Sequence, residues 1–343
     1  MNTERTEVSA LGEFGLIHHL TKNFETRNAS TIVSIGDDAA IIDHFGKQTV
    51  ISSDLLIEGI HFDLMYTPLR HLGYKSVIVN LSDIYAMNAT PTHITMNIAF
   101  SNRFSVEALD EFYEGVYYAC EKYGVDLIGG DTSASQKGFI ISVTAIGEVV
   151  PDKFVRRNTA QKSDLICVSG DLGGAFLGLT ILEREKKIFT ENPQVQPDLE
   201  NEDYIVGRLL KPEARKDIID FFAENEIVPT AMMDVSDGIS SEILHICKQS
   251  NLGCVLVEDK LPIHDSTRAA AFKFGLDPTV CALNGGEDYE LIFTLRQEDY
   301  DKITLNEEIS VIGYMTDAEE GAKFLSRGGN TFDITAQGWN AFP

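Results

Sequence analysis

Basic residues are scarce in this sequence: its 343 residues include 28 Lys and Arg against 53 Asp and Glu, a net charge of −25. Nucleic-acid binding depends on Lys and Arg that neutralise phosphates, so such a surface is not expected to bind DNA or RNA. No run reaches the about 18 uninterrupted apolar residues of a membrane helix. Residues 1–10 are polar and lack the basic-then-apolar order of a secretory signal. The composition therefore favours a protein of the cytoplasm.

Cysteine is sparse as well, with five residues and no Cys-x-x-Cys pair. An odd, scattered set argues against a disulfide framework and against a structural zinc site, and it fits a reducing compartment. The P-loop motif, the protein-kinase motifs and the Gly-x-Ser-x-Gly elbow are also missing. The glycine-rich stretch 170–174 does not have dinucleotide-binding spacing, and we interpret it as a turn that opens a helix.

The length suits two domains of about 150 residues each, and the 43% of hydrophobic residues can form their cores. A polar, turn-rich segment, Pro151 to Lys162, is the best candidate for the junction, which gives domains 1–150 and 151–343. Both halves mix strand and helix patterns. An acidic, Pro-containing segment, Glu191 to Asp203, is expected to be an exposed loop, and its role does not follow from the sequence.

Aspartates recur directly after short apolar runs that we expect to be strands. Four positions share this pattern: Asp38, Asp54, Asp131 and Asp234. Loops at strand ends project from a rigid sheet and commonly bind ligands. A further acid, Asp83, falls on the apolar stripe of a helix predicted over residues 69–88, so it should point inward.

Several inward acids would repel one another unless a cation lies among them. Magnesium prefers carboxylate, hydroxyl and phosphate oxygens, and Ser52, Ser53 and Ser236 offer hydroxyls beside the acids. A structural alternative stays open, because a single Gly-Asp or Ser-Asp pair commonly forms a turn or a helix cap. Asp237 in particular could cap the helix predicted after Gly238.

Seven strings resemble those of the thiamine-monophosphate kinase family, which belongs to a superfamily with aminoimidazole ribonucleotide synthetase and selenophosphate synthetase. The likeness runs nearly end to end, and two of the strings, residues 51–62 and 285–291, look like the thiamine enzyme specifically. The strings are GEF with LI after it (12–17), IGDDA (35–39), ISSDLLIEGIHF (51–62), VNLSD (79–83), LIGGDT (127–132), DVSDG (234–238) and GGEDYEL (285–291).

The resemblance implies a two-domain α+β or α/β fold like that of aminoimidazole ribonucleotide synthetase. Its N-terminal domain is β-rich, binds ATP and magnesium and pairs into a homodimer, and its C-terminal α/β domain completes the active site. The implied reaction is ATP-dependent phosphorylation of thiamine monophosphate to thiamine diphosphate, the last step of that biosynthesis, with several Mg²⁺ ions. No nucleic acid or membrane partner is implied.

The resemblance also implies roles for individual residues. It implies catalysis through bound metal at Asp54, Asp131 and Asp234, and metal ligands at Asp38, Ser52, Ser53, Asp54, Asp83, Asp131, Asp234 and Asp237. ATP would lie near Tyr123, Gly130, Asp131, Arg157 and Ser236. Thiamine monophosphate would contact His61, Glu287 and Trp339, the last by a cation–π stack.

Each of these substrate residues also has a structural interpretation: His61 could satisfy a loop, and Trp339 could be a packing anchor. The sequence departs from the family pattern at two positions. Ser53 stands where threonine is common but keeps the hydroxyl, whereas Leu55 removes a polar group after Asp54. Asp37 matches the motif, although it could cap the turn instead of binding metal.

The expected chemistry needs no general base, because the second pKa of a phosphate monoester is about 6 and the acceptor is largely dianionic at neutral pH. Magnesium held by the aspartates, together with Arg157, would offset the repulsion between the two phosphates. Transfer is expected to be direct, without a phosphoenzyme.

Two alternatives remain at this stage. The first is another ATP-using enzyme of the superfamily, although residues 1–30 lack the reactive cysteine of selenophosphate synthetase. The second is a non-catalytic regulator that binds magnesium or nucleotide.

Overall fold

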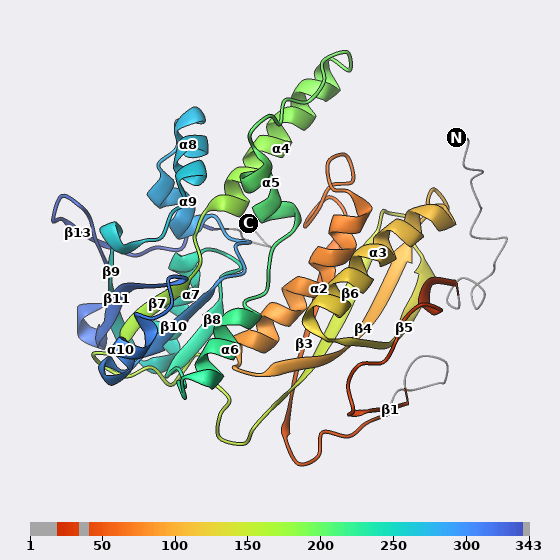
Figure 1. Ribbon diagram of the computed structural model, residues 1–343. Helices are drawn as coiled ribbons and strands as arrows, with labels where there is room; N and C mark the ends of the chain where they lie inside the picture. The colour runs from red at the N-terminus through yellow and green to blue at the C-terminus, as the bar shows by residue number, and fades with distance from the viewer. Residues whose placement is uncertain (1–18, 34–40, 339–343) are drawn as a thin grey trace. The chain divides into compact units, whose positions relative to one another are not determined.

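The computed structural model describes residues 19–33 and 41–338 of the chain. The chain divides into two compact units (Figure 1). The N-terminal unit comprises residues 1–84 and 89–152, and the C-terminal unit comprises residues 85–88 and 153–343. Within the described part, no helix combines the length and the apolar character needed to cross a membrane.

The N-terminal unit is built on a four-stranded sheet of order β3-β6-β4-β5. Its strands are β3 (Gln48–Ile57), β4 (Thr90–Phe100), β5 (Asp126–Ala134) and β6 (Ile140–Val149). β6 pairs antiparallel with both β3 and β4, whereas β4 and β5 are parallel. A separate short pair consists of β1 (Thr31–Val33) and β2 (Ile41–Ile42). β3 is therefore an edge strand of the four-stranded sheet.

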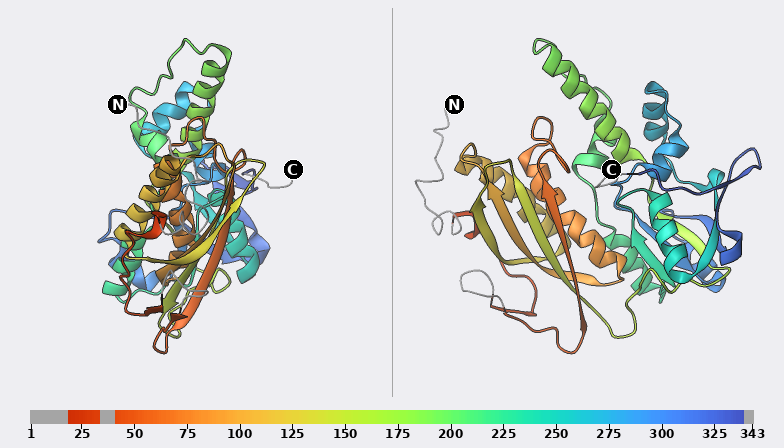
Figure 2. Two further views of the ribbon diagram at one scale, coloured as in Figure 1. Left: turned by 90° about the vertical axis from the view of Figure 1, so that its right-hand side faces the viewer. Right: turned by 180° about the vertical axis from the view of Figure 1, so that it is seen from behind.

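Two helices, α2 (Leu69–Ala86) and α3 (Val106–Tyr123), cover one face of this sheet (Figures 1 and 2). Their backbones touch at two glycines. A Cβ on Gly73 would lie 1.9 Å from the Phe112 carbonyl oxygen, and one on Gly115 would lie 1.9 Å from the Arg70 carbonyl oxygen. Only glycine fits at such an approach. The contact fixes α2, the helix that carries Asp83.

The C-terminal unit contains a seven-stranded sheet of order β13-β12-β9-β11-β7-β10-β8, in which only β12 and β9 are parallel neighbours. The strands are β7 (Leu165–Ser169), β8 (Ala231–Asp234), β9 (Leu252–Val257), β10 (Leu291–Leu295), β11 (Ile309–Asp317), β12 (Ala322–Leu325) and β13 (Thr331–Asp333). All five residues of β10 are buried, as expected for a strand inside a sheet that is covered on both faces.

Helices of the C-terminal unit pack around this sheet and form two apolar clusters. The larger cluster joins the sheet to α7, and the smaller one joins α4, α5, α8 and α9. The helices are α4 (Gly174–Glu191), α5 (Asp203–Leu210), α6 (Lys216–Glu224), α7 (Ile239–Ser250), α8 (Asp265–Lys273), α9 (Pro278–Asn284) and α10 (Tyr300–Ile303), with short 3-10 turns η2 (Glu258–Lys260), η3 (Gln297–Asp299) and η4 (Ala318–Glu320).

Several predicted elements are confirmed. The amphipathic spacing of residues 106–123, with Gly124 after them, predicts a helix that stops there. α3 does end at Gly124, which has the left-handed φ of 69° typical of a helix stop. The helix after Gly238 spans Ile239–Ser250 as expected, and the stretch 170–174 does open a helix, α4. The pattern of residues 9–22 also predicts a short helix, and this segment lies mostly outside the described residues.

Candidate active site

The two predicted metal ligands Asp54 and Asp83 lie close together between β3 and α2. The Ser52 hydroxyl donates a hydrogen bond of 2.5 Å to Asp83 Oδ2. The backbone N–H of Asp54 donates a hydrogen bond of 3.0 Å to Oδ1 of Asn80, which lies one turn before Asp83 on α2. Asn80 is fully buried, and its Nδ2 donates to the Ser76 carbonyl oxygen at 3.0 Å. Two side chains of α2 thus bind consecutive inward positions of β3.

The burial of Asp54 and its closeness to Asp83 change the pKa of Asp54. Burial, followed by repulsion from Asp83, raises the pKa of Asp54 from 3.8 to about 6. The half-buried carboxylate therefore favours its neutral form in the absence of a counter-ion. A cation placed between Asp54 and Asp83 would reverse this preference, since it stabilises both charged forms.

Ser53 and Asp131 do not point into the space between β3 and α2. Strand alternation directs Ser53 to the face opposite the helices, where its Oγ lies 3.0 Å from Thr144 Oγ1. Asp131 is exposed on β5 and pairs in register with Asn97, which is exposed on β4. The structure therefore separates these two predicted ligands from Asp54 and Asp83 by the thickness of the sheet.

One structural expectation is wrong. Asp54 and Asp131 were expected in loops after strand ends, but they lie inside β3 and β5, and Asp234 is the last residue of β8. β3 continues because each of its residues from Gln48 to Ile57 has a partner on β6. The acids thus gain their positions from strand register and not from loop geometry.

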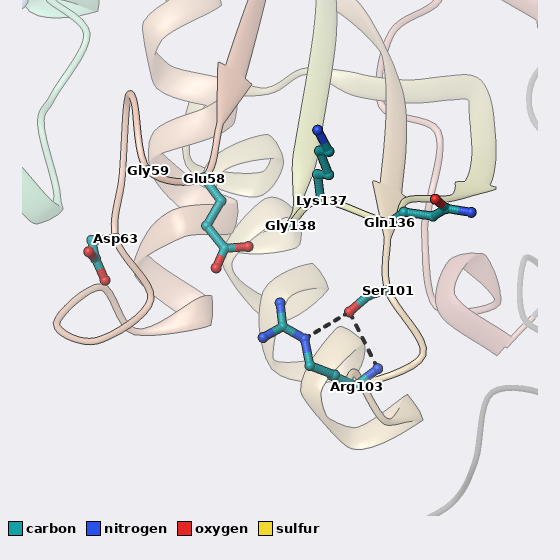
Figure 3. A pocket seen from close by; sticks show the side chains of 8 residues that line it. All are labelled: Glu58, Gly59, Asp63, Ser101, Arg103, Gln136, Lys137 and Gly138. Atoms are coloured by element: carbon teal, nitrogen blue, oxygen red, sulfur yellow. Dashed lines mark hydrogen bonds between the residues drawn. The ribbon is translucent and has the colours of Figure 1, made fainter.

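His61, a predicted substrate residue, has a structural contact in the loop after β3. Its Nδ1 accepts a hydrogen bond of 3.1 Å from the Ile57 N–H, and the Gly59 N–H donates to the Phe62 carbonyl at 2.8 Å. These bonds close a tight loop. The same loop contributes Glu58 to a pocket of the N-terminal unit (Figure 3), a residue that the sequence analysis did not single out.

The predicted ATP residues of the N-terminal unit differ in exposure. Tyr123 is buried at the end of α3, and the Lys122 ammonium lies 5.5 Å from its ring centroid. Gly130 is exposed, and a Cβ there would lie 1.8 Å from the Met96 carbonyl oxygen. Glycine is thus required for β5 to approach β4 at this point.

The C-terminal unit brings Asp234, Ser236, Asp237 and Glu287 together. The Glu287 N–H donates to the Ser236 carbonyl at 2.7 Å, and neighbouring backbone bonds join the same two loops. Burial raises the pKa of Asp237; His245 opposes the rise and Glu287 adds to it, so the two carboxylates share one environment. Glu287 has a positive φ of 59°, an uncommon conformation for this residue type and one that often marks functional sites.

Glu242 supports this loop, and the sequence analysis missed it. Its Oε1 accepts a hydrogen bond of 2.9 Å from the Asp237 N–H, and its side chain is buried. Burial raises its pKa from 4.5 to about 8. A glutamate in the first turn of a helix that accepts from the preceding loop acts much as a capping-box glutamate does, but it lies five residues after its donor and not three, so the capping-box spacing gave no signal in the sequence.

Two acids that follow Glu287 are structural. The fully buried Asp288 accepts hydrogen bonds from the N–H groups of Gly173 and Ala175 at the start of α4, at 2.7 Å and 3.3 Å. Glu290 accepts from Arg215 Nη1 at 2.7 Å. The N-terminus of α4 therefore already holds a carboxylate of this chain.

Arg157 is exposed in the C-terminal unit, and its carbonyl accepts a hydrogen bond of 3.3 Å from the Ser250 hydroxyl.

Three predicted site residues, Asp37, Asp38 and Trp339, lie outside the described residues. Gly338, which precedes Trp339, packs so closely on the Asp237 carbonyl oxygen that a Cβ would lie 2.2 Å from it.

Comparison with known proteins identifies the family to which the chain belongs. Residues 36–149 match the family model described as AIR synthase related protein, N-terminal domain. The thiamine-monophosphate kinase of Bacillus subtilis (strain 168) is 31% identical over 341 residues, covering 97% of this chain and 100% of the relative. That of Aquifex aeolicus (strain VF5) is 32% identical, covering 97% and 98%. The chain belongs to the thiamine-monophosphate kinase family.

Solved structures agree with this placement in the kinase family. Thiamine-monophosphate kinase from Stenotrophomonas maltophilia K279a superposes with a TM-score of 0.77 at 30% identity, over 93% of this chain and 95% of that one. The structure described as AaThiL complexed with AMPPCP and TMP has a TM-score of 0.75 at 30% identity and covers both chains completely. Hydrogenase maturation protein HypE, at 18% identity and a TM-score of 0.75, shares the fold. The two-domain fold like that of aminoimidazole ribonucleotide synthetase is thus confirmed.

Proposed function

We propose that this member of the thiamine-monophosphate kinase family transfers the γ-phosphoryl group of ATP to the phosphate of thiamine monophosphate, which yields thiamine diphosphate and ADP. The observation that carries the proposal is the pair of carboxylates, Asp54 and Asp83, held beside the Ser52 hydroxyl. The relative described with AMPPCP and TMP supports the choice of both substrates.

The residues fit Mg²⁺, because the donor set consists of hard oxygen atoms and a cation would offset the repulsion between Asp54 and Asp83. Within residues 19–33 and 41–338, no group of three or more His, Cys, Asp and Glu side chains is arranged to hold a metal. Magnesium is commonly bound by one or two carboxylates, with substrate phosphates completing its shell. The proposed ligands are Ser52, Asp54 and Asp83 beside α2, Ser53 and Asp131 for a separate ion on the opposite face of the sheet, Asp234 and Asp237 in the C-terminal unit, and Asp38.

Bound magnesium supplies charge neutralisation between the two phosphates. The protein's own part is to hold these groups in place: Asn80 and Ser52 fix the carboxylates, and Glu242 fixes the Asp237 loop. Arg157 would add a positive group beside ATP. The acceptor phosphate needs no base, so direct transfer without a phosphoenzyme follows.

The remaining assignments are part of the same proposal. ATP contacts Tyr123, Gly130, Asp131, Arg157 and Ser236, and thiamine monophosphate contacts His61, Glu287 and Trp339. Asp237, a proposed metal ligand, and Glu287, a proposed substrate residue, share one environment. This supports placing the metal and the substrate next to each other in the C-terminal unit.

We also propose a homodimer formed through the sheet face opposite α2 and α3. Ile51 and Leu55 are 64% and 50% exposed on that face, which is unusual for apolar side chains on a strand. A second copy would bury them.

The five cysteines are free and buried, which supports a reducing compartment, the cytoplasm.

Incubation with ATP, Mg²⁺ and thiamine monophosphate, followed by separation of products, tests the reaction. Thiamine diphosphate and ADP should form in equal amounts and only with magnesium. Omission of thiamine monophosphate should stop ADP formation. Binding of ATP and magnesium without any product would instead support the non-catalytic regulator, and a phosphorylated protein trapped during turnover would exclude direct transfer.

A further inference from the structure

The loop that carries Glu287, residues 285–290, joins α9 to β10 and has an unusual backbone. Glu287 and Tyr289 have positive φ angles of 59° and 53°, although neither is glycine. Such conformations cost energy and persist only where surrounding contacts hold them. Asp288 lies between the two residues and is buried. The contacts that Asp288 makes therefore bear on the conformation of both neighbours.

Backbone hydrogen bonds attach this loop to the segment that carries Ser236, a proposed ATP residue. The Glu287 N–H donates to the Ser236 carbonyl at 2.7 Å, and the Tyr289 N–H donates to the Val235 carbonyl at 2.9 Å. The backbone on either side of Asp288 is thus joined to the proposed site of the C-terminal unit.

The Asp288 side chain joins the same loop to helix α4. Its carboxylate accepts hydrogen bonds from the Gly173 N–H at 2.7 Å and from the Ala175 N–H at 3.3 Å. Both N–H groups lie at the N-terminus of the helix, where the helix dipole favours a negative charge. The N-cap residue of α4 is Gly173, which has no side chain to accept from these groups. Asp288 therefore caps α4 from 115 residues away.

Arg208 of α5 holds the main chain of Asp288. Its Nη2 donates to the Asp288 carbonyl oxygen at 3.3 Å and to the Asp171 carbonyl oxygen at 2.9 Å. The guanidinium also forms an ion pair of 3.0 Å with Glu290. A planar guanidinium that contacts several acceptors at once is restricted in orientation. Asp288 is thus held at both its side chain and its carbonyl group, and this restrains the left-handed residues on either side of it.

We propose that Asp288, together with Arg208, is a positioning residue that holds Glu287 in its left-handed conformation and thereby sets the affinity for thiamine monophosphate. The inference rests on the proposed function, in which Glu287 contacts this substrate. Asp288 is buried, so its effect on the substrate passes through the half-buried Glu287. A residue that only capped α4 would stabilise the fold and leave the affinity for the substrate unchanged.

The first variant is Asp288→Asn, which keeps the shape of the side chain and one acceptor oxygen but removes the charge. The KM for thiamine monophosphate should rise about tenfold, as expected for weakening of a charged hydrogen bond. The KM for ATP should change less than about twofold. An unchanged KM for thiamine monophosphate in a folded Asp288→Asn protein would overturn the proposal.

Asp164→Asn is the matched control. Asp164 is also buried and accepts a hydrogen bond of 2.8 Å from the Gln161 N–H. It lies just before β7, whose first residue, Leu165, pairs with Leu295 at the end of β10 that is remote from the Glu287 loop. This variant should lose stability without a change in either KM.

Arg208→Lys separates positioning from capping, because it leaves the bonds between Asp288 and α4 in place. Lysine keeps a positive charge for Glu290 but lacks the planar fork that reaches the carbonyl groups. The KM for thiamine monophosphate should rise in this variant as well. An unchanged KM in Arg208→Lys would contradict the part assigned to Arg208.

A double-mutant cycle tests whether the effect passes through Glu287. Glu287→Ala should raise the KM for thiamine monophosphate, and the addition of Asp288→Asn should raise it by less than about a further twofold. Residues that act independently would instead multiply their separate fold-changes in the double variant. That outcome would overturn the proposal.

A measurement without substrate separates this inference from the proposed function. Hydrogen–deuterium exchange of the metal-free full chain reports opening of residues 285–290. The N–H groups of Glu287 and Tyr289 should exchange faster in Asp288→Asn than in the wild type or in Asp164→Asn. Equal exchange in all three proteins would contradict the positioning role even if the wild type transfers phosphate. Faster exchange in Asp288→Asn, with no phosphoryl transfer by the wild type, would support the positioning of Glu287 and overturn only the proposed function.

Discussion

The backbone N–H of Asp54 donates a 3.0 Å hydrogen bond to Oδ1 of the fully buried Asn80. β3 is an edge strand of its sheet, and its outer edge would otherwise present unpaired N–H groups. The side chain from α2 therefore satisfies the edge and fixes the residue that carries the proposed metal-binding carboxylate.

Asn80→Ala should weaken activation by magnesium, because it frees the backbone at Asp54. Loss of a residue that orients a metal ligand commonly costs about 10–100-fold in affinity or activity. We expect the magnesium concentration for half-maximal activity to rise, with a loss of about 1–3 kcal/mol in the free energy of unfolding. Ser76→Ala is the control, since that hydroxyl donates to Gly73 O one turn away on the same helix. A normal magnesium response in Asn80→Ala would contradict this role.

Asp54→Asn should lower turnover by orders of magnitude while the metal-free protein gains stability near pH 7. The pKa of Asp54 lies at about 6, above its ordinary 3.8, so the folded protein binds more protons than the unfolded chain between these values. The unfolding free energy of the wild type should therefore fall as pH rises through that window, and the variant should lack this fall. Chemical denaturation of both metal-free proteins between pH 4 and pH 7 measures it.

Asp131→Asn should also reduce turnover strongly, and without the stability gain, because this side chain is exposed. Near-native activity of either aspartate variant at low magnesium would rule out that residue as a ligand.

Glu242→Gln should match the wild type in stability at pH 4 and exceed it at pH 9. The pKa of Glu242 is raised from 4.5 to about 8, so the unfolded chain ionises first, and the unfolding free energy of the wild type falls as pH rises through this range. Glutamine keeps the acceptor for the Asp237 N–H and cannot ionise. Glu242→Ala removes the acceptor and should lose stability at both pH values. Parallel pH curves for wild type and Glu242→Gln in urea unfolding would refute this account.

Gly115→Ala should destabilise the N-terminal unit by about 1–3 kcal/mol, the usual cost of overpacking, and lower activity with it. Its Cβ would meet the Arg70 carbonyl at 1.9 Å and push α2, with Asn80 and Asp83, away from α3. Gly207→Ala is a matched control, because a Cβ there meets nothing within 4 Å in helix α5. That change should stabilise by up to about 1 kcal/mol. Thermal unfolding and steady-state activity of both variants give the comparison.

Ile51→Lys should convert the proposed dimer to a monomer, since it places a charge on the face that a second copy would cover. Light scattering after size-exclusion chromatography measures the mass of wild type and variant. Ile188→Lys, on a partly exposed apolar position of α4, is the control and should leave the mass unchanged. A monomeric wild type would exclude this interface.

Local patterns predicted much of the fold. The periodicity of residues 106–123 with Gly124 after them gave one helix and its end, because a 3.6-residue repeat and a left-handed stop are properties of the chain itself. In contrast, β9, β11, β12 and β13 escaped prediction. Their pairing depends on partners far along the chain, such as Ala322 with Cys254.

The same distinction applies to the site. The sequence by itself determined which acids are available, and it contains the family motifs. It also determined that some acids must lie inward, since Asp83 falls on an apolar helical stripe. Only the tertiary structure decided that Asp54 lies inside a strand beside Asn80, and that Ser53 faces away. Strand register alternates side chains between two faces, and which face meets a helix is set by packing between segments that are distant in the chain.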